Sequence, residues 1–230
     1  MEGCVGGVRR RRQAARLGVL LRPERQLWRQ GYQHVAGVDE VGVGPLAGPV
    51  VAAAVLFHAD IHIAGVDDSK RVPPATRMRL AEEIRARALA VGVGVVAVED
   101  IDRLNIYHAA LEAMRRAVAG LALTPDYLLV DARTVPGLAI PQLPMIKGDA
   151  RSFSIAAASI VAKVTRDALM TELAARYPEY GFAEHMGYGT PAHLDAIQRF
   201  GPCPAHRRSF APVRQPLLPG IGLRAAPAAD

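Results

Sequence analysis

The sequence has few cysteines and no long hydrophobic run. Its two cysteines, Cys4 and Cys203, stand at opposite ends of 230 residues, so they build no disulfide framework and match no metal spacing, a pattern that fits a reducing compartment. The longest apolar run, residues 46–57, is interrupted by Gly48 and Pro49 and is too short to span a bilayer. Residues 17–21 are too short for a secretory signal core. These absences predict a soluble cytoplasmic protein.

The body of the chain also lacks net charge. The whole sequence carries 28 Lys and Arg against 22 Asp and Glu, for a net charge of +6, which suggests an anionic partner such as nucleic acid or a membrane surface. Residues 1–30, however, hold eight arginines and two glutamates. The remaining 200 residues are therefore neutral, and the basic character belongs to the N-terminus.

Half of the residues are hydrophobic and 22% are charged, enough apolar material for one folded domain. We expect a disordered basic arm over residues 1–21, a catalytic domain over 22–214 and a flexible tail over 215–230 that is rich in Pro, Ala and Gly. The hydrophobic patterns predict strands over residues 35–40, 49–57, 91–99, 127–131 and 140–146, and helices over 76–90, 102–119, about 152–177 and from 190. This order indicates an α/β domain with a mixed sheet covered by helices.

Carboxylates end two predicted strands and precede the longest helix. Asp39 and Glu40 follow the first strand, Asp131 ends the fourth, and Asp149 stands just before the long helix. If the two strands are neighbours, these acids meet at one sheet edge and repel one another unless a cation neutralises them. All-oxygen ligation selects Mg²⁺ or Mn²⁺, and paired ions serve many phosphodiester-cleaving enzymes. The alternative is that the acids are separate strand-end caps or ion-pair partners.

Other polar residues have structural interpretations. Asp167 lies four residues after Lys163, where an ion pair within a helix is easy; support of the acid cluster is the alternative. We expect the histidines at positions 185, 193 and 206 to be hydrogen-bonded structural or surface residues rather than catalytic bases. Arg207 and Arg208 are expected to be an exposed charge pair, with contact to a duplex as the alternative.

The order of several motifs resembles the type 2 ribonuclease H family, ribonuclease HII, over residues 24–214. The motifs are AGVDEVGVGPLAGPV at residues 36–50, DSK at 68–70, LVD at 129–131, KGD at 147–149, residues 154–167, GYGT at 187–190 and GPCPAHRRSF at 201–210. A lone Asp-Glu pair would be weak, whereas the whole set in this order is specific.

The resemblance implies a ribonuclease H-like fold: a mixed five-stranded sheet flanked by helices, with a C-terminal helical segment. It implies cleavage of RNA in RNA–DNA hybrids and incision 5′ to ribonucleotides embedded in duplex DNA by two-metal-ion hydrolysis, leaving 5′-phosphate and 3′-hydroxyl ends. We also expect a monomer that uses Mn²⁺ or Mg²⁺. The residues it implies are Asp39, Glu40 and Asp131 as metal ligands, Asp149 as the fourth acid, and Gly42, Val43, Gly44, Ser69, Lys70 and Tyr188 at the substrate. Glycines let a backbone approach a ribose closely, and the Tyr188 ring can stack on a sugar or base or simply pack in its loop.

Two positions depart from the family pattern. Val43 stands where the family usually has Arg between two glycines, and Met186 stands where Lys is common. Each change removes a cation that could contact phosphate, so we expect weaker substrate binding. Two alternatives stay open: a hybrid-binding protein of the same fold with weakened cleavage or junction specificity, and a different nuclease such as a 3′-exonuclease or resolvase. The glycine loop and the GYGT loop argue against the different nuclease.

Overall fold

One mixed sheet forms the centre of the computed structural model, which describes residues 13–59, 61 and 63–214. Its strands lie in the order β3-β2-β1-β4-β5. Neighbours β1–β2 and β2–β3 are antiparallel, and β1–β4 and β4–β5 are parallel. The strands are β1 (Val35–Val41), β2 (Val50–Leu56), β3 (Ala90–Val96), β4 (Tyr127–Asp131) and β5 (Gln142–Met145). The predicted fold class is confirmed, and β5 occupies an edge, as Pro144 requires.

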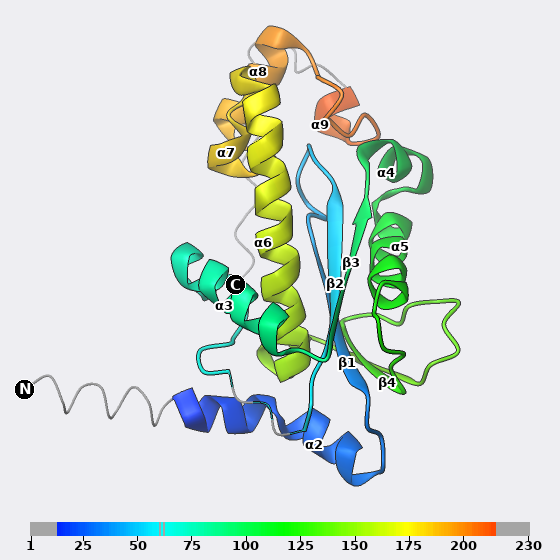
Figure 1. The fold of residues 1–230 in the computed structure, drawn as a ribbon. Coiled ribbons are helices and arrows are strands. Elements are labelled where there is room, and N and C mark those ends of the chain that lie inside the picture. The colour runs from blue at the N-terminus through cyan, green and yellow to red at the C-terminus, as the bar shows by residue number, and fades with distance from the viewer. Residues whose placement is uncertain (1–12, 60, 62, 215–230) are drawn as a thin grey trace, which may run out of the picture.

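Helices cover both faces of this sheet (Figure 1). The long α6 and α3 cover one face, α5 covers the other, and α7 and α8 gather near the C-terminal end of α6. The helices are α2 (Arg22–Arg29), α3 (Pro74–Arg87), α4 (Val98–Leu104), α5 (Ile106–Ala119), α6 (Phe153–Arg176), α7 (Phe182–His185), α8 (Pro191–Phe200) and α9 (Ala211–Arg214). None of those described is both long and apolar enough to cross a membrane.

Glycines bring α5 and α6 close to the sheet. A Cβ at Gly37 of β1 would overlap the backbone of Ser154 in α6. Likewise, Cβ atoms at Gly92 and Gly94 of β3 would overlap carbonyl oxygens of α5. Every residue of β2 is buried, because its alternating side chains enter the core under α6 on one face and the core under α5 on the other.

The single helix predicted over residues 102–119 is two helices. Asn105 separates α4 from α5 with a φ of 67° and a ψ of 163°, backbone angles at which a right-handed helix cannot continue. Its side chain also accepts a hydrogen bond from the backbone N–H of His108 and so caps α5. Residues 98 and 99, expected at the end of a strand, begin α4 instead.

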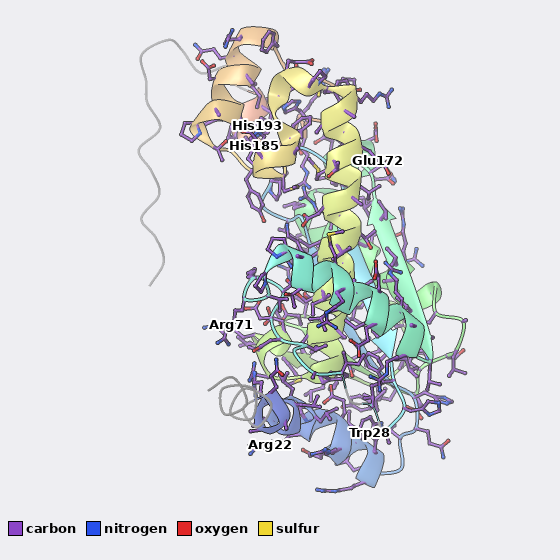
Figure 2. All side chains as sticks on the ribbon, turned by 60° about the vertical axis from the view of Figure 1, so that its left-hand side comes forward. Arg22, Trp28, Arg71, Glu172, His185 and His193 are labelled. Carbon is purple, nitrogen blue, oxygen red and sulfur yellow. The ribbon has the colours of Figure 1, made fainter. Side chains whose placement is uncertain are left out.

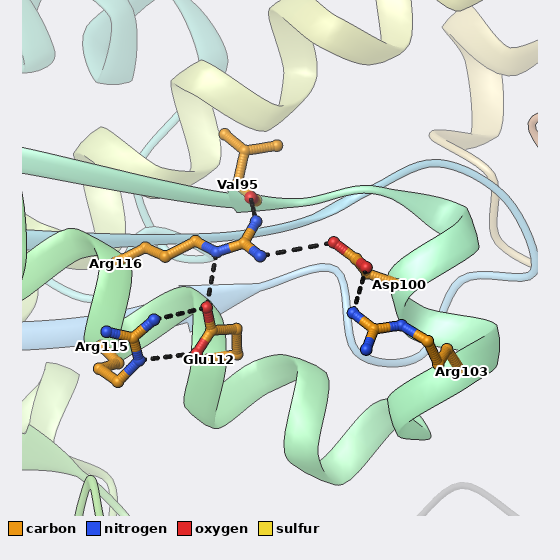
Figure 3. Close-up of polar contacts among 6 residues, drawn as sticks. All are labelled: Val95, Asp100, Arg103, Glu112, Arg115 and Arg116. Carbon is orange, nitrogen blue, oxygen red and sulfur yellow. Dashed lines mark hydrogen bonds and ion pairs between the residues drawn. The ribbon is translucent and has the colours of Figure 1, made fainter. Parts of the chain in front are cut away.

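An ion-pair network ties α4, α5 and β3 together on the outer side (Figure 3). Glu112 contacts both Arg115 (2.7 Å) and Arg116 (2.8 Å). Arg116 also donates to the Val95 carbonyl at 2.7 Å and pairs with Asp100 at 3.4 Å. The arginine hydrogen bonds, that of Arg115 foremost, lower the pKa of Glu112 to about 2. The network is near the surface, so its contribution to stability is modest.

The folded part of the chain begins earlier than predicted. Residues 13–20 form a helix, and Leu20 and Leu21 are completely buried in the core under α6. Arg16 pairs with Asp67 at 2.6 Å. The predicted boundary between arm and domain at residue 21 is thus corrected: residues 13–21 belong to the folded part. The many arginines of this segment suggested a solvated arm, but Leu20 and Leu21 pack into the core. Residues 1–12 of the predicted arm, and the predicted tail at 215–230, lie outside the described residues.

Candidate active site

Three carboxylates meet where the neighbouring inner strands β1 and β4 end. Asp39 and Glu40 lie at the end of β1, and Asp131 ends the neighbouring parallel strand β4, where Val38 and Val130 are in register. One ligand oxygen from each acid lies within 4.8 Å of the other two. The parallel pairing therefore brings together the residues that the sequence predicted to share a site.

Burial makes this cluster electrostatically unfavourable without a cation. Asp39 is 5% exposed, and burial, followed by the charges of Glu40 and Asp131, raises its pKa well above the ordinary value. Burial also raises the pKa of Glu40, although the nearby charge of Arg133 opposes this. The Glu40 Oε2 atom is buried and has no hydrogen-bond partner among the described residues. An orphaned carboxylate oxygen among acids fits a hard divalent cation.

Asp149 lies beside the three-acid group rather than within it. It belongs to a single 3₁₀ turn, η1 (Gly148–Ala150). The N–H of Gly148 in the same turn donates to Asp131 Oδ1 at 2.7 Å and orients that carboxylate. The pKa of Asp149 is raised by burial and by the charges of Asp68 and Asp131, so its side chain is electrostatically coupled to the group.

The glycine loop at residues 42–49 connects β1 to β2 and faces the GYGT loop. Gly42 has a φ of +92°, and a Cβ there would overlap the Arg166 side chain. Gly44 is different: it is exposed, and a Cβ there would only touch the Tyr188 ring at 3.6 Å. Tyr188 itself is 47% exposed. The two loops are joined by a hydrogen bond from the Leu46 N–H to the Gly187 carbonyl at 2.8 Å.

The other predicted substrate residues differ in exposure. Ser69 is buried, and its hydroxyl accepts a hydrogen bond from Ser159 at 2.8 Å, so this side chain is already engaged within the fold. Lys70 is exposed, and its charge opposes the raised pKa of Glu40. Val43 is half-buried against the core under α5. Met186, with a φ of 50°, precedes the GYGT loop.

The interpretations of Asp167 and of the histidines as structural residues agree with the structure. Asp167 pairs with Lys163 at 2.6 Å and with Arg77 at 3.5 Å. His193 is fully buried, and the His185 ring stacks on it with centroids 4.4 Å apart. Figure 2 shows both rings near the C-terminal end of α6, far from α2.

The interpretation of Arg207 as an exposed charge was wrong. Arg207 and Arg166 are both completely buried, and their guanidinium groups bind the glycine loop from behind. Sequence reasoning missed them because an arginine carries no periodic signal that distinguishes burial from exposure. Both arginines can be buried because carbonyl oxygens of the glycine loop accept hydrogen bonds from their guanidinium groups.

A five-stranded mixed sheet with three clustered carboxylates that could hold a metal ion, where β1 and β4 end, is the arrangement of the ribonuclease H-like class of metal-dependent nucleases. Residues 36–213 match the family model described as Ribonuclease HII. The chain belongs to the ribonuclease HII family, whose members are endonucleases that hydrolyse phosphodiester bonds.

Relatives and solved structures agree with this assignment. The chain is 59% identical to a ribonuclease HII from Geobacillus thermodenitrificans over 86% of this chain and 76% of that protein. It is 57% identical to one from Myxococcus xanthus, over 90% and 71%. Among solved structures, ribonuclease H2 from Pyrococcus horikoshii matches with a TM-score of 0.67 and 28% identity, over 79% of this chain and 95% of that one.

Proposed function

We propose that this protein cleaves the RNA strand of RNA–DNA hybrids and incises 5′ to ribonucleotides embedded in duplex DNA, leaving 5′-phosphate and 3′-hydroxyl ends. The observation that carries the proposal is the cluster of Asp39, Glu40 and Asp131, with its orphaned Glu40 Oε2 atom. Repelling buried acids lower stability unless a cation binds them, so a protein that only bound hybrids would have no need of them.

In this mechanism, Asp39, Glu40 and Asp131 would hold Mn²⁺ or Mg²⁺. When bound there, such ions would activate a water for in-line attack and stabilise negative charge on the leaving oxygen. The Gly148 N–H keeps the Asp131 carboxylate oriented towards the cluster. Asp149 serves as the fourth acid beside this group, where burial and the charges of Asp68 and Asp131 raise its pKa.

The two facing loops are the proposed substrate contacts. Gly42 and Gly44 let the loop backbone approach a ribose, whose 2′-hydroxyl distinguishes RNA from DNA, and Val43 lies between them. The exposed Tyr188 ring stacks beside the nucleotide, and Lys70 in the Ser69-Lys70 loop contacts a backbone phosphate. Action as a cytoplasmic monomer stays a prediction from the sequence.

The second candidate is a hybrid-binding protein with weak cleavage or weak junction specificity. Val43 and Met186 favour it, because both occupy positions where the family usually places a cation. A loss of one phosphate contact weakens binding and reduces its dependence on salt. The intact set of acids favours the enzyme.

One gel assay separates the two candidates. The protein is incubated with a DNA duplex that contains one ribonucleotide, with and without Mn²⁺, beside Asp131→Asn and a control variant, Asp195→Asn. Asp195 is an exposed acid on α8, so its variant should cut like the parent. Cutting without metal, or by Asp131→Asn, would contradict the mechanism. Binding without cutting by the parent would favour the second candidate.

A further inference from the structure

The Arg207 side chain donates its hydrogen bonds to carbonyl groups of the glycine loop at residues 42–49. Its guanidinium is fully buried and donates hydrogen bonds to five carbonyl oxygens of this one loop. The acceptors are Gly42 (2.6 Å), Val43 (3.1 Å), Pro45 (2.7 Å), Gly48 (2.8 and 3.0 Å) and Pro49 (3.3 Å). A single side chain therefore fixes the orientation of most peptide groups in the loop.

No carboxylate of the described residues lies within 4.0 Å of this guanidinium to form an ion pair. The Phe210 ring lies 5.2 Å from the guanidinium carbon, and the positive charge of Arg166, which shares the Pro49 carbonyl, also acts on this group. A buried cation without a counterion is costly unless hydrogen bonds satisfy it. The negative ends of the loop's peptide dipoles take this role, so cation and loop conformation depend on each other.

The same arrangement determines where the loop's N–H groups point. In a planar trans peptide, the N–H points opposite to the C=O of the preceding residue, and the described chain has no cis peptide bond. The carbonyls of Gly42 and Val43 point inward to Arg207. The N–H groups of Val43 and Gly44 must therefore point outward, and neither donates to any atom of the described residues.

We propose that Arg207 is a positioning residue that holds the Val43 and Gly44 N–H groups as a fixed pair of donors for the 2′-hydroxyl oxygen of the substrate ribose. The inference rests on the proposed function, since it takes this loop as the ribose contact. Fixed peptide dipoles recognise a polar group without reorganisation. Recognition by main-chain donors also does not require the arginine that Val43 replaces.

The test compares Arg207→Lys with Arg166→Lys, both in the Asp131→Asn background so that the substrate stays intact. Arg166 is equally buried but binds the carbonyls of Ala47, Pro49 and Met186, none of which belongs to the two outward peptides. The affinity of each protein is measured for a DNA duplex with one ribonucleotide and for the same duplex with deoxyribose there. The ratio of the two affinities cancels any loss of folded protein.

Arg207→Lys should lower this ratio by about 3- to 10-fold, the effect of one or two neutral hydrogen bonds, and Arg166→Lys should leave it unchanged. An unchanged ratio in Arg207→Lys, or an equal fall in both variants, would overturn the inference while leaving ribose recognition intact. A ratio of one in the Asp131→Asn background itself would overturn ribose recognition by this protein, and the inference with it.

Amide hydrogen exchange keeps the inference testable if Arg207→Lys does not fold. In the Asp131→Asn protein, the Val43 and Gly44 amides should exchange rapidly when free and slow by at least about 3-fold with the ribonucleotide duplex, but not with the all-DNA duplex. Equal protection by both duplexes, or protection in the free protein, would overturn the inference.

Discussion

The Nε2 atoms of His193 and His206 lie 3.0 Å apart in the buried C-terminal part of the fold. The Cys203 N–H donates to His206 Nδ1 at 3.0 Å, so the His206 proton is on Nε2 and is donated to His193. The His193 proton is then on Nδ1, which donates to the Tyr188 carbonyl at 2.8 Å. This chain of neutral rings fixes the backbone of the GYGT loop.

The first prediction concerns the pH dependence of stability. Burial is the main cause that lowers the pKa values of His193 and His206 from 6.5 to about 4. Between these values the unfolded chain binds more protons, so the free energy of unfolding should fall as the pH drops from 6.5 to 4. The slope is at most about 1.4 kcal/mol per pH unit for each ring. Urea unfolding of His206→Gln should show a shallower fall, and exposed His58→Gln should match the parent; equal slopes would contradict the prediction.

The second prediction separates two neighbouring glycines. Gly42→Ala should lower the free energy of unfolding by about 1–3 kcal/mol, because of its positive φ and the overlap with Arg166. Gly44→Ala should leave thermal unfolding nearly unchanged, since a methyl group there only touches Tyr188. It should nevertheless reduce cleavage at a single ribonucleotide at least about 10-fold, because the methyl group keeps the ribose away. If Gly44→Ala were fully active, the prediction that this loop contacts the substrate would be wrong.

The third prediction concerns the arginine that the family resemblance leads us to expect at position 43, where this chain has Val43. Val43→Arg should raise cleavage of a single-ribonucleotide duplex and steepen the dependence of log affinity on log salt by about 0.9. Val43→Leu is the control, since it enlarges the side chain without adding a charge. If Val43→Arg gains neither activity nor salt dependence, the departure at this position is harmless.

The fourth prediction follows from repulsion within the acid cluster. Asp39→Asn should abolish cleavage and, without metal, raise the free energy of unfolding by about 1 kcal/mol at neutral pH, because it removes a buried charge. Its Oδ1 can still accept from the Glu40 N–H as in the parent. Thermal unfolding with a chelator and with Mn²⁺ checks this: Mn²⁺ should stabilise the parent more than the variant. A less stable metal-free variant would contradict it.

The fifth prediction concerns the basic N-terminus. Deletion of residues 1–12 removes four arginines, so it should lower the salt dependence of hybrid binding. Deletion of residues 1–21 should also destabilise the fold, because it removes buried Leu20 and Leu21 and the Arg16–Asp67 pair. An unchanged salt dependence after the shorter deletion would exclude the arginines from substrate binding.

The sequence by itself determined the sheet, the family and the identity of the clustered acids. Strand periods and strand-end carboxylates are local patterns, and the parallel pairing of β1 with β4 then brings Asp39 and Asp131 together. The sequence also indicated the edge position of β5, because proline cannot donate to a strand ladder.

Tertiary structure alone decided which charged and polar residues lie inside. Arg207 and the pair His193–His206 are buried by contacts between segments far apart in the chain, such as Arg207 with Gly42. No local pattern encodes these contacts, because the burial of a cation depends on how many carbonyl groups the rest of the fold turns towards it. The sequence thus identifies the acids that cluster, while the fold decides how the loop beside them is held.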